Sequence, residues 1–405
     1  MAINTERKQF PLLYVHQHSR GIFGFGAHKM AGQECQMYGI KHALLVTTGL
    51  KGTGIVDEVE GVLKANGIAI TRFEGFTSNP KDFECAEGTK VYLEAGCDGI
   101  VSVGGGSAQD GGKGIRIMLT NDGPDTSLMD FCAFLDPHYT TRIPTYKVVN
   151  IPHVAINTTT GTGAEGTAFA IINDTEWVYK LILVVPGVAP SVGINDPAFM
   201  RLQPPHIVAW TGIDAFCHAM EPGIGRFNMP VVHATAMRAI KLLSENIRQA
   251  YANPANDVAI ENMAWAQFIA SMSYNLGGGM GMVHGTAHML SVIKDLHHGY
   301  TNAIMMLPVE RFNAVACPEK FKEIGEAMGL DIHHMNPVHA TDVTLDEIER
   351  LRNDVGIPQV PLKDFDFTET DIEHTAKWAI NDLSREANPR DITPEQIKEI
   401  MRSCI

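Results

Sequence analysis

Apolar and polar residues follow two different periods along the first half of the chain. Short apolar runs rich in branched residues lie at 42–48, 67–75 and 97–103, and each is typical of a β-strand. Between them, 55–65 and 82–95 place apolar residues at helical spacing. The run 97–103 is apolar almost throughout, which indicates a strand that is buried on both faces. This β-α-β-α-β order predicts a parallel sheet covered by helices.

The pattern changes after Asp196–Pro197. Before that point, three further strands are predicted at 146–156, 167–172 and 181–185. Beyond it, strand-like alternation almost disappears, and helical spacing is found at 230–252, 256–275, 318–329, 344–354 and 370–385. The sequence therefore predicts an α/β nucleotide-binding domain over 1–198 and an all-α domain over 199–405. The cleft between two tightly joined domains is a natural place for a functional site.

The composition is that of an ordinary globular protein, and the net charge of the chain bears on whether it binds nucleic acid. Lysine and arginine total 32 against 46 aspartate and glutamate residues, so the formal net charge is −14. A negative surface repels phosphate backbones, and we therefore expect no nucleic-acid partner. The chain has no apolar stretch of about eighteen residues and no secretory signal at its start. We therefore expect no association with a membrane.

Cysteine usage bears on the cellular compartment. The chain has seven cysteines, which are widely spaced and form no CxxC pair. An odd number of scattered thiols is typical of a reducing compartment and not of a disulfide framework. The sequence therefore predicts a cytoplasmic protein.

Two glycine-rich segments are candidates for nucleotide binding. GGGS at 104–107 follows the buried strand and precedes helix-compatible sequence. Glycines let the backbone approach a ligand, and a helix N-terminus presents free N–H groups to an anion. The segment predicts either a pyrophosphate site or a tight turn that needs positive φ. It is not a P-loop, because Lys113 is followed by Gly114.

The second segment, GTGAEG at 161–166, matches GxGxxG, but a strand-like run follows it where the dinucleotide fingerprint requires a helix. Hydroxyl groups surround it, from Thr158, Thr159, Thr160 and Thr162. They predict either hydrogen bonds to a phosphate or ribose, or a threonine-rich turn.

One aspartate and several histidines recur at helical spacing in the second half. Asp214 and His218 are four residues apart, as are His284 and His288, and His298 follows ten residues later. Residues four apart on a helix share one face. A carboxylate and imidazoles from separate helices suit Fe²⁺ or Zn²⁺, and a histidine in an apolar helix needs a polar partner. Surface or hydrogen-bonded core histidines are the alternative.

Five segments in this order resemble the iron-containing, or group III, metal-dependent alcohol dehydrogenases. They read GGGSAQDGGKGI (104–115), NTTTGTGAEGT (157–167), TGIDAFCHAMEP (211–222), GMVHGTAHMLSVIKDLHHGYTNAIMMLP (281–308) and EANPRDITPEQI (386–397). The resemblance covers nearly the whole chain. It implies a Rossmann-like domain followed by an all-helical metal domain, and hydride transfer between an alcohol or aldehyde and a nicotinamide cofactor.

The resemblance also implies roles for individual residues. The metal ligands fall on Asp214, His218, His284 and His298, with Fe²⁺ as the ion of the family and Zn²⁺, Mg²⁺ and Mn²⁺ as alternatives. Cofactor contacts fall on Thr48, Asn79, Gly104, Gly105, Gly106, Ser107, Thr158, Thr159, Thr162 and Lys180, with Asp110 and Lys113 supporting the glycine loop. His288 would lie near the nicotinamide, where it either passes the alcohol proton toward solvent or only shapes the pocket.

Three departures from the family pattern bear on cofactor and substrate. Thr48 stands where many members carry an acidic residue that holds the adenosine ribose, which weakens the implied preference for NAD(H) over NADP(H). Asn157 and His297 each replace a proline. The segments TTGLKGTG, SNPKD and HHG are nearest to the branch that oxidises methanol and other short primary alcohols, some members of which hold the cofactor tightly. The family is usually dimeric or larger, so we expect a homo-oligomer.

Other functions remain as alternatives. A lyase of the dehydroquinate synthase type would use NAD transiently and bind zinc, but the ligand pattern is closer to the alcohol dehydrogenases. A metal-dependent hydrolase would not need the nucleotide segments, and the chain has no HExxH motif. A nicotinamide-binding module without catalysis is a third. The sequence predicts an oxidoreductase in which a divalent metal polarises the oxygen of a small alcohol or aldehyde.

Overall fold

A computed structural model describes residues 18–133, 147–227, 229–360 and 362–404. Its main sheet contains β1 (Arg20–Phe23), β2 (His42–Thr47), β3 (Ala69–Phe73), β4 (Gly99–Gly104), β5 (His153–Asn157) and β8 (Val192–Asn195). The strands lie in the order β1-β8-β5-β4-β2-β3, and all neighbouring pairs are parallel. The predicted parallel sheet in the first half of the chain is therefore confirmed.

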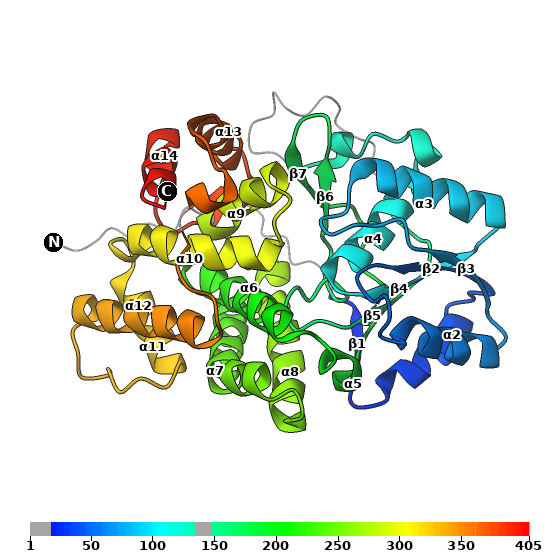
Figure 1. The fold of residues 1–405 in the computed structure, drawn as a ribbon, viewed down its shortest axis with the longest axis horizontal. Coiled ribbons are helices and arrows are strands. Elements are labelled where there is room, and N and C mark those ends of the chain that lie inside the picture. The colour runs from blue at the N-terminus through cyan, green and yellow to red at the C-terminus, as the bar shows by residue number, and fades with distance from the viewer. Residues whose placement is uncertain (1–17, 134–146, 228, 361, 405) are drawn as a thin grey trace.

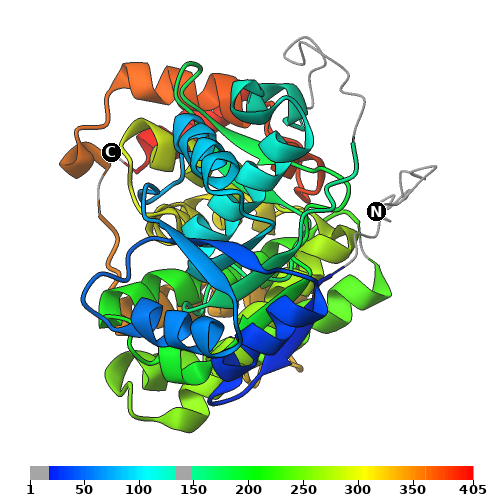
Figure 2. The same ribbon diagram turned by 90° about the vertical axis from the view of Figure 1, so that its right-hand side faces the viewer.

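Helices cover both faces of this sheet because its strands are apolar on both sides (Figures 1 and 2). The first four are α1 (Ala31–Met37), α2 (Ile55–Ala65), α3 (Asp82–Ala95) and α4 (Gly106–Thr120). Successive residues of a strand point to opposite faces. Leu44 of β2 belongs to the same apolar cluster as Ile115 of α4, whereas Leu45 belongs to the cluster that holds Ile55 of α2.

The strand order reverses between β2 and β4. The chain runs from β2 outward to β3, returns to β4 beside β2, and then continues to β5 on the other side. Ligands of open parallel sheets bind at the carboxyl ends of the strands where the order reverses. Thr48 follows β2 and the glycine segment 104–107 follows β4, so the topology brings two predicted cofactor segments together.

Strands β6 (Ala170–Asp174) and β7 (Tyr179–Leu183) form a separate antiparallel hairpin. They lie two to three residues away from the bounds predicted at 167–172 and 181–185. The short loop between them cannot make the long crossover that parallel pairing requires.

The strand predicted at 146–156 begins only at His153, because Pro152 before it has no N–H to donate to a neighbouring strand. Residue 146 lies outside the described residues. Strands β1 and β8 were not predicted, because four residues are too few to show a period.

The second half is helical, as predicted, and no strand follows β8 in the described part of the chain. Its helices are α5 (Pro197–Met200), α6 (Pro205–Ile224), α7 (Pro230–Ala252), α8 (Asp257–Ser273), α9 (Met282–Ile293), α10 (His298–Ala314), α11 (Pro318–Ala327), α12 (Pro337–Asp354), α13 (Glu369–Ala379) and α14 (Pro394–Arg402). The helical spacing of apolar residues in the sequence predicted α7, α8, α11, α12 and α13, although the ends of these helices differ from the predicted bounds. It did not predict α6, α9 and α10, because a helix that is buried on nearly all sides has no amphipathic period.

Two further observations concern the chain as a whole. None of the described helices combines the length and the apolar character that a membrane crossing needs. All seven cysteines are buried and unpaired, which agrees with the prediction of free thiols.

Candidate active site

A cavity of about 810 Å³ lies where the carboxyl ends of the sheet meet the helical half. Both halves line it, from Thr48 after β2 to His298 at the start of α10. Every residue that we predicted for the site contributes to its wall except Gly104, Lys113 and Thr160. Residues from distant parts of the sequence therefore share a single cavity.

The glycine segment forms a turn that leads into α4. Gly104 has a φ of 151°, which favours glycine, and Gly105 is the N-cap of the helix without a side-chain cap. A Cβ at Gly105 would lie 2.7 Å from Cγ2 of Thr159, and one at Gly106 would lie 2.8 Å from Cγ2 of Thr162. The segment is thus a tight turn that packs against the threonine loop. Its uncapped helix N-terminus lines the cavity and suits a pyrophosphate.

Asn157 holds the threonine loop in place. Its Nδ2 donates to the Thr159 carbonyl at 2.9 Å and to Oδ1 of Asn195 at 3.0 Å, and its Oδ1 accepts from the Thr159 N–H at 3.0 Å. Thr158, Thr159 and Thr162 line the cavity, whereas Thr160 is buried beside Thr211. The loop is a threonine-rich turn, and three of its hydroxyl-bearing residues are placed where a phosphate or ribose would bind.

Lys113 lies behind the glycine loop and not in the cavity. Its Nζ donates to Oδ1 of Asp110 at 3.0 Å, one turn away on α4, and to the Phe169 carbonyl. Lys113 is fully buried, and Asp110 reaches the cavity wall. The pair therefore connects α4 to the segment around Phe169, and its role in supporting the glycine loop stays a prediction.

Asn79 and Lys180 connect the α/β half to the α9–α10 loop. Asn79 has a φ of 53°, and its Nδ2 donates to Oδ1 of Asp295 and to the Leu296 carbonyl, each at 3.1 Å. Lys180 donates to Oδ1 of Asn79 at 3.2 Å and to Oγ of Ser291 at 2.8 Å. Burial lowers the pKa of Lys180 to about 8. Its ammonium group is thus held at the cavity wall, where it suits a ribose hydroxyl or a phosphate.

Thr48 donates its hydroxyl to the Phe76 carbonyl at 2.8 Å and lines the cavity. No carboxylate therefore stands at the end of β2, where an acidic residue would accept the 2′-hydroxyl of the adenosine ribose. The next residues along this wall are Gly49, Leu50 and Lys51.

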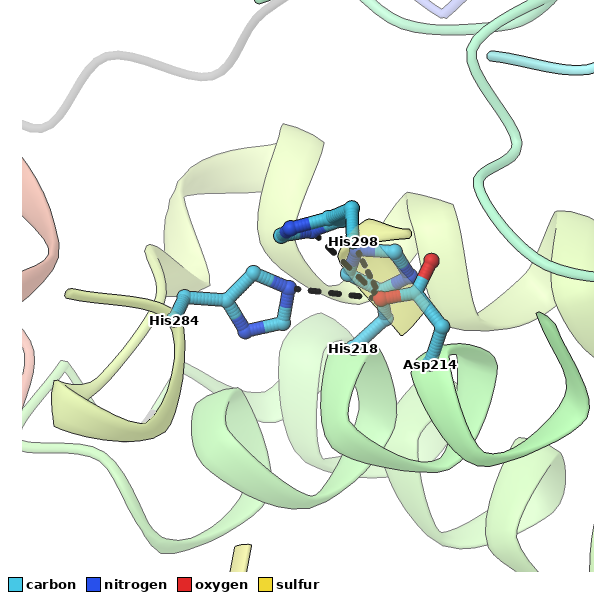
Figure 3. A group of neighbouring side chains, drawn as sticks. All are labelled: Asp214, His218, His284 and His298. Atoms are coloured by element: carbon cyan, nitrogen blue, oxygen red, sulfur yellow. Dashed lines mark ion pairs between the residues drawn. The ribbon is translucent and has the colours of Figure 1, made fainter. Parts of the chain in front are cut away.

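Asp214, His218, His284 and His298 converge at the other end of the cavity, from helices α6, α9 and α10 (Figure 3). One ligand atom of each residue lies within 4.8 Å of the others. Oδ1 of Asp214 lies 3.9, 3.7 and 3.5 Å from Nε2 of His218, His284 and His298, respectively. Four donors arranged tetrahedrally at about 2.1 Å from an ion would be about 3.4 Å apart. The four residues therefore fit a single metal ion with little adjustment.

Hydrogen bonds and burial prepare these histidines for a metal. Nδ1 of His284 bonds to the buried Glu221 carboxylate, and Nδ1 of His218 lies 3.3 Å from the Gly161 carbonyl. Both bonds leave the Nε2 lone pair directed toward the centre. Burial lowers the pKa of His284 and of His298, so these imidazoles are neutral. Neutral imidazoles with one carboxylate suit Fe²⁺, Zn²⁺ and similar ions.

His288 lies beside the four ligands but is not one of this group. Its ring is stacked on that of His298, with centroids 5.3 Å apart, and its Nδ1 donates to Oδ2 of Asp382 at 2.8 Å. Burial alone would raise the pKa of Asp382, but His288 and donors from Ser384 outweigh it and hold that pKa below its usual value. The carboxylate therefore stays ionised and fixes the orientation of the His288 ring.

Three buried side chains that hold the site, Glu221, Asp382 and Asn302, were not predicted from the sequence. Glu221 follows Asp214 by seven residues, which is two helical turns on one face, so spacing could have suggested it. Asn302 follows His298 by four residues in the same way. Asp382 comes from beyond α13 and has no local signal, because only folding brings it to α9.

The fold and the site together define a class of protein, in which a parallel α/β sheet and a helical half share a cavity that suits a dinucleotide and a divalent metal. Comparison with known families makes the assignment specific. The profile of the iron-containing alcohol dehydrogenases matches residues 19–197, and the profile of the C-terminal part of the same family matches 208–405. The chain belongs to the iron-containing alcohol dehydrogenase family.

Individual relatives agree with this assignment. The chain is 39% identical over 386 residues to the 1,3-propanediol dehydrogenase of Klebsiella pneumoniae, an alignment that covers 95% of this chain and 96% of the relative. It is 33% identical to the NAD-dependent methanol dehydrogenase of Bacillus methanolicus, with 95% and 97% covered. The crystal structure of a 1,3-propanediol oxidoreductase superposes with a TM-score of 0.89 at 38% identity, covering 97% and 100% of the two chains.

These findings confirm the predicted family, fold and enzyme class. The chain is an oxidoreductase of alcohols or aldehydes, and the lyase and hydrolase alternatives gain no support. The roles of individual residues follow from the geometry and are argued below as proposals.

Proposed function

We propose that this enzyme transfers hydride between a small primary alcohol, such as methanol or another short alcohol, and NAD(H). The main support is that four metal-binding side chains and an uncapped helix N-terminus share one cavity. One relative is named as a 1,3-propanediol dehydrogenase and another as an NAD-dependent methanol dehydrogenase. These names support short alcohols as substrates and NAD as the cofactor.

The helical half would hold the ion through Asp214, His218, His284 and His298, with Fe²⁺ as the first choice and Zn²⁺, Mg²⁺ or Mn²⁺ as alternatives. A divalent ion there supplies Lewis-acid polarisation of the substrate oxygen, and a bound nicotinamide supplies the hydride acceptor. Asp214 is the one acidic residue among the four, so a divalent ion held by them would keep a net positive charge toward the substrate oxygen. His288, oriented by Asp382, would accept the alcohol proton and pass it toward solvent.

The α/β half would hold the cofactor. The N-terminus of α4, at Gly105, Gly106 and Ser107, would bind the pyrophosphate, and the threonine loop with Asn79 and Lys180 would bind the ribose on the nicotinamide side. A dinucleotide held in this way would reach the metal ligands with its nicotinamide end, because both groups of residues line one cavity. Gly104 and Lys113 would act indirectly, by shaping and supporting the loop.

The test is to load the purified protein with Fe²⁺ under anaerobic conditions and to follow reduction of NAD⁺ with a series of short alcohols. We expect a rise in the absorbance of the reduced nicotinamide that requires both metal and alcohol. An artificial electron acceptor and a spectrum of the protein as purified cover the case of a tightly held cofactor. Absence of turnover with NAD⁺, with NADP⁺ and with the artificial acceptor would refute the proposal.

We further infer that residues 1–198 and 199–405 are the nucleotide and metal domains of a homo-oligomeric cytoplasmic enzyme. Strand β1 lies at the edge of the sheet, where unpaired backbone groups favour association. Exposed aromatic side chains lie beside it, namely Phe25 and Trp265, and the latter stacks on Phe23. Light scattering coupled to size-exclusion chromatography tests the oligomeric state, and a monomer at micromolar concentration would contradict it.

A further inference from the structure

Asn302 directs its side-chain amide into the centre of the candidate metal site. It lies on α10 one turn after His298 and is fully buried. Its Nδ2 lies 2.6 Å from Oδ1 of Asp214, and 3.1 Å from Nε2 of both His284 and His298. Oδ1 of Asp214 accepts, and each Nε2 accepts when the ring proton is on Nδ1, which in His298 has no hydrogen-bond partner among the described residues. These are the three atoms through which the same residues would bind an ion.

The neighbours of Asn302 determine which way its amide points. With the amide reversed, Oδ1 would face the Asp214 carboxylate at hydrogen-bond distance, and two acceptors would repel each other. When His284 donates its Nδ1–H to Glu221, its Nε2 carries a lone pair and accepts a hydrogen bond. In the observed orientation Oδ1 of Asn302 has no hydrogen-bond partner among the described residues. The amide thus leaves its own acceptor unpaired, and its two N–H groups are shared among three atoms of the candidate metal ligands.

We propose that Asn302 is a positioning residue for the metal site. In the metal-free protein, its amide keeps three of the four ligands together through hydrogen bonds. When an ion binds, the two imidazoles exchange their hydrogen bonds to Asn302 for bonds to the ion. This inference rests on the proposed metal site. An imidazole Nε2 has one lone pair, which serves either an N–H donor or a cation but not both. A carboxylate oxygen has further lone pairs, so the bond from Asn302 to Asp214 is compatible with both conditions.

The proposal predicts that Asn302 affects the two forms of the protein unequally. In the metal-free protein, removal of the amide leaves the carboxylate and two imidazoles buried without a donor, which is strongly unfavourable. In the metal-loaded protein, the ion satisfies those lone pairs, and only the bond to Asp214 is lost. Substitution of Asn302 should therefore destabilise the metal-free form more than the loaded form, and it should tighten metal binding.

The experiment compares the wild type with Asn302→Leu after a chelator has removed bound metal. Each protein is titrated with Zn²⁺, which has no redox chemistry, against a chromophoric chelator, and thermal unfolding is recorded with and without saturating Zn²⁺. We expect the Tm of the metal-free variant to fall by at least about 4 °C and that of the Zn²⁺-loaded variant to fall by less than half as much. The variant should bind Zn²⁺ about tenfold more tightly.

Asn246→Leu is the matched control. Asn246 is a buried amide on α7, whose Nδ2 donates to the Leu242 carbonyl at 2.7 Å, and it has no contact with the metal ligands. Its loss should lower the two Tm values equally and leave the affinity for Zn²⁺ unchanged. Asn302→Ala, which introduces no bulk, replaces the leucine variant if that variant does not fold in either form.

Two outcomes would overturn the proposal. Equal losses of Tm in the two forms would show that Asn302 only packs the core. Weaker binding of Zn²⁺ by the variant would show that Asn302 orients the ligands for the bound ion or ligates it directly. Failure of the wild type to bind Zn²⁺ or Fe²⁺ at all would instead refute the proposed metal site, so the two failures are distinguishable.

Discussion

The two halves of the molecule build their shares of one cavity by different means. In the α/β half, the wall consists mainly of backbone: a glycine turn, the N-terminus of α4 and a threonine loop held by Asn157. In the helical half, the wall carries buried ionisable side chains, of which His284 and His288 are each paired with a carboxylate, Glu221 and Asp382.

This difference separates two kinds of recognition. Backbone N–H groups and small residues bind a phosphate through shape and partial charge. Such a site therefore requires room for the ligand more than particular side chains. A metal needs particular donor atoms with free lone pairs, and each donor needs a fixed tautomer. Substitutions in the two halves should therefore impair different functions, cofactor binding in one and metal binding in the other.

The largest effect is expected from His284→Ala in the helical half. Loss of this ligand should remove the metal and lower kcat/KM by at least about a thousandfold, because the polarising charge is lost. Binding of the cofactor should stay within about twofold of the wild type, since the α/β wall is untouched. Metal analysis, steady-state kinetics and a cofactor titration check this.

His333→Ala is the control for that variant. His333 belongs to an exposed group, together with Asp331 and His334, that could also hold an ion. The control should keep both metal and activity. If His333→Ala lost the metal and His284→Ala kept it, the site would be wrongly placed.

The next effect is expected from His288→Ala. Turnover should fall by about a hundredfold or more, because a general base contributes on that scale, while the metal content stays intact. Stopped-flow kinetics and metal analysis check this. Loss of the metal would make His288 a ligand and contradict its assigned role, and unchanged turnover would leave it the role of shaping the pocket.

In the α/β half, Gly106→Ala should weaken the binding of NAD⁺ by about tenfold, because the new Cβ would lie 2.8 Å from Cγ2 of Thr162. The metal content should not change. Gly61→Ala on α2 is the matched control, since a Cβ there meets no atom within 4 Å. Fluorescence titration of the cofactor measures both variants, and a loss of metal in Gly106→Ala would show that the two walls are not independent.

The smallest effect concerns the pH dependence of cofactor binding. Since the pKa of Lys180 is lowered to about 8, its ammonium group is charged below that pH and loses its charge above it. Affinity for the dinucleotide should therefore fall several-fold as the pH rises through about 8. Lys180→Arg stays charged and should flatten the profile. An unchanged profile in that variant would assign the pH dependence to another group.

The sequence predicted those elements that carry their own period. The segment IVDEVEGVLKA is an amphipathic helix, α2, with the bounds that the spacing suggested, because one face of it is buried and the other is solvated. The strand at 42–48 ends one residue earlier than expected. The helices that carry the candidate metal ligands were harder to predict, because α6 and α9 are buried on nearly all sides and their apolar residues show no preferred face.

The residue types of the candidate site could be predicted from the sequence, but the pairing of its histidines with the buried carboxylates that orient them could not. The spacing of Asp214 and His218 indicates a shared helix face, and the resemblance to the family suggests which histidines join them. Nothing in the spacing connects His284 to Glu221, or His288 to Asp382, because these pairs are 63 and 94 residues apart.

The sequence alone therefore determined that an α/β part is followed by a helical part, since local periods are properties of neighbouring residues. It also suggested candidate side chains for the site, through their spacing and the resemblance to the family. Only the tertiary structure decided which lone pairs are free, which carboxylate orients each imidazole, and that the amide of Asn302 points at the metal ligands. Those choices depend on how α6, α9 and α10 pack together. Packing is a property of surfaces that are distant in the chain and meet only after folding.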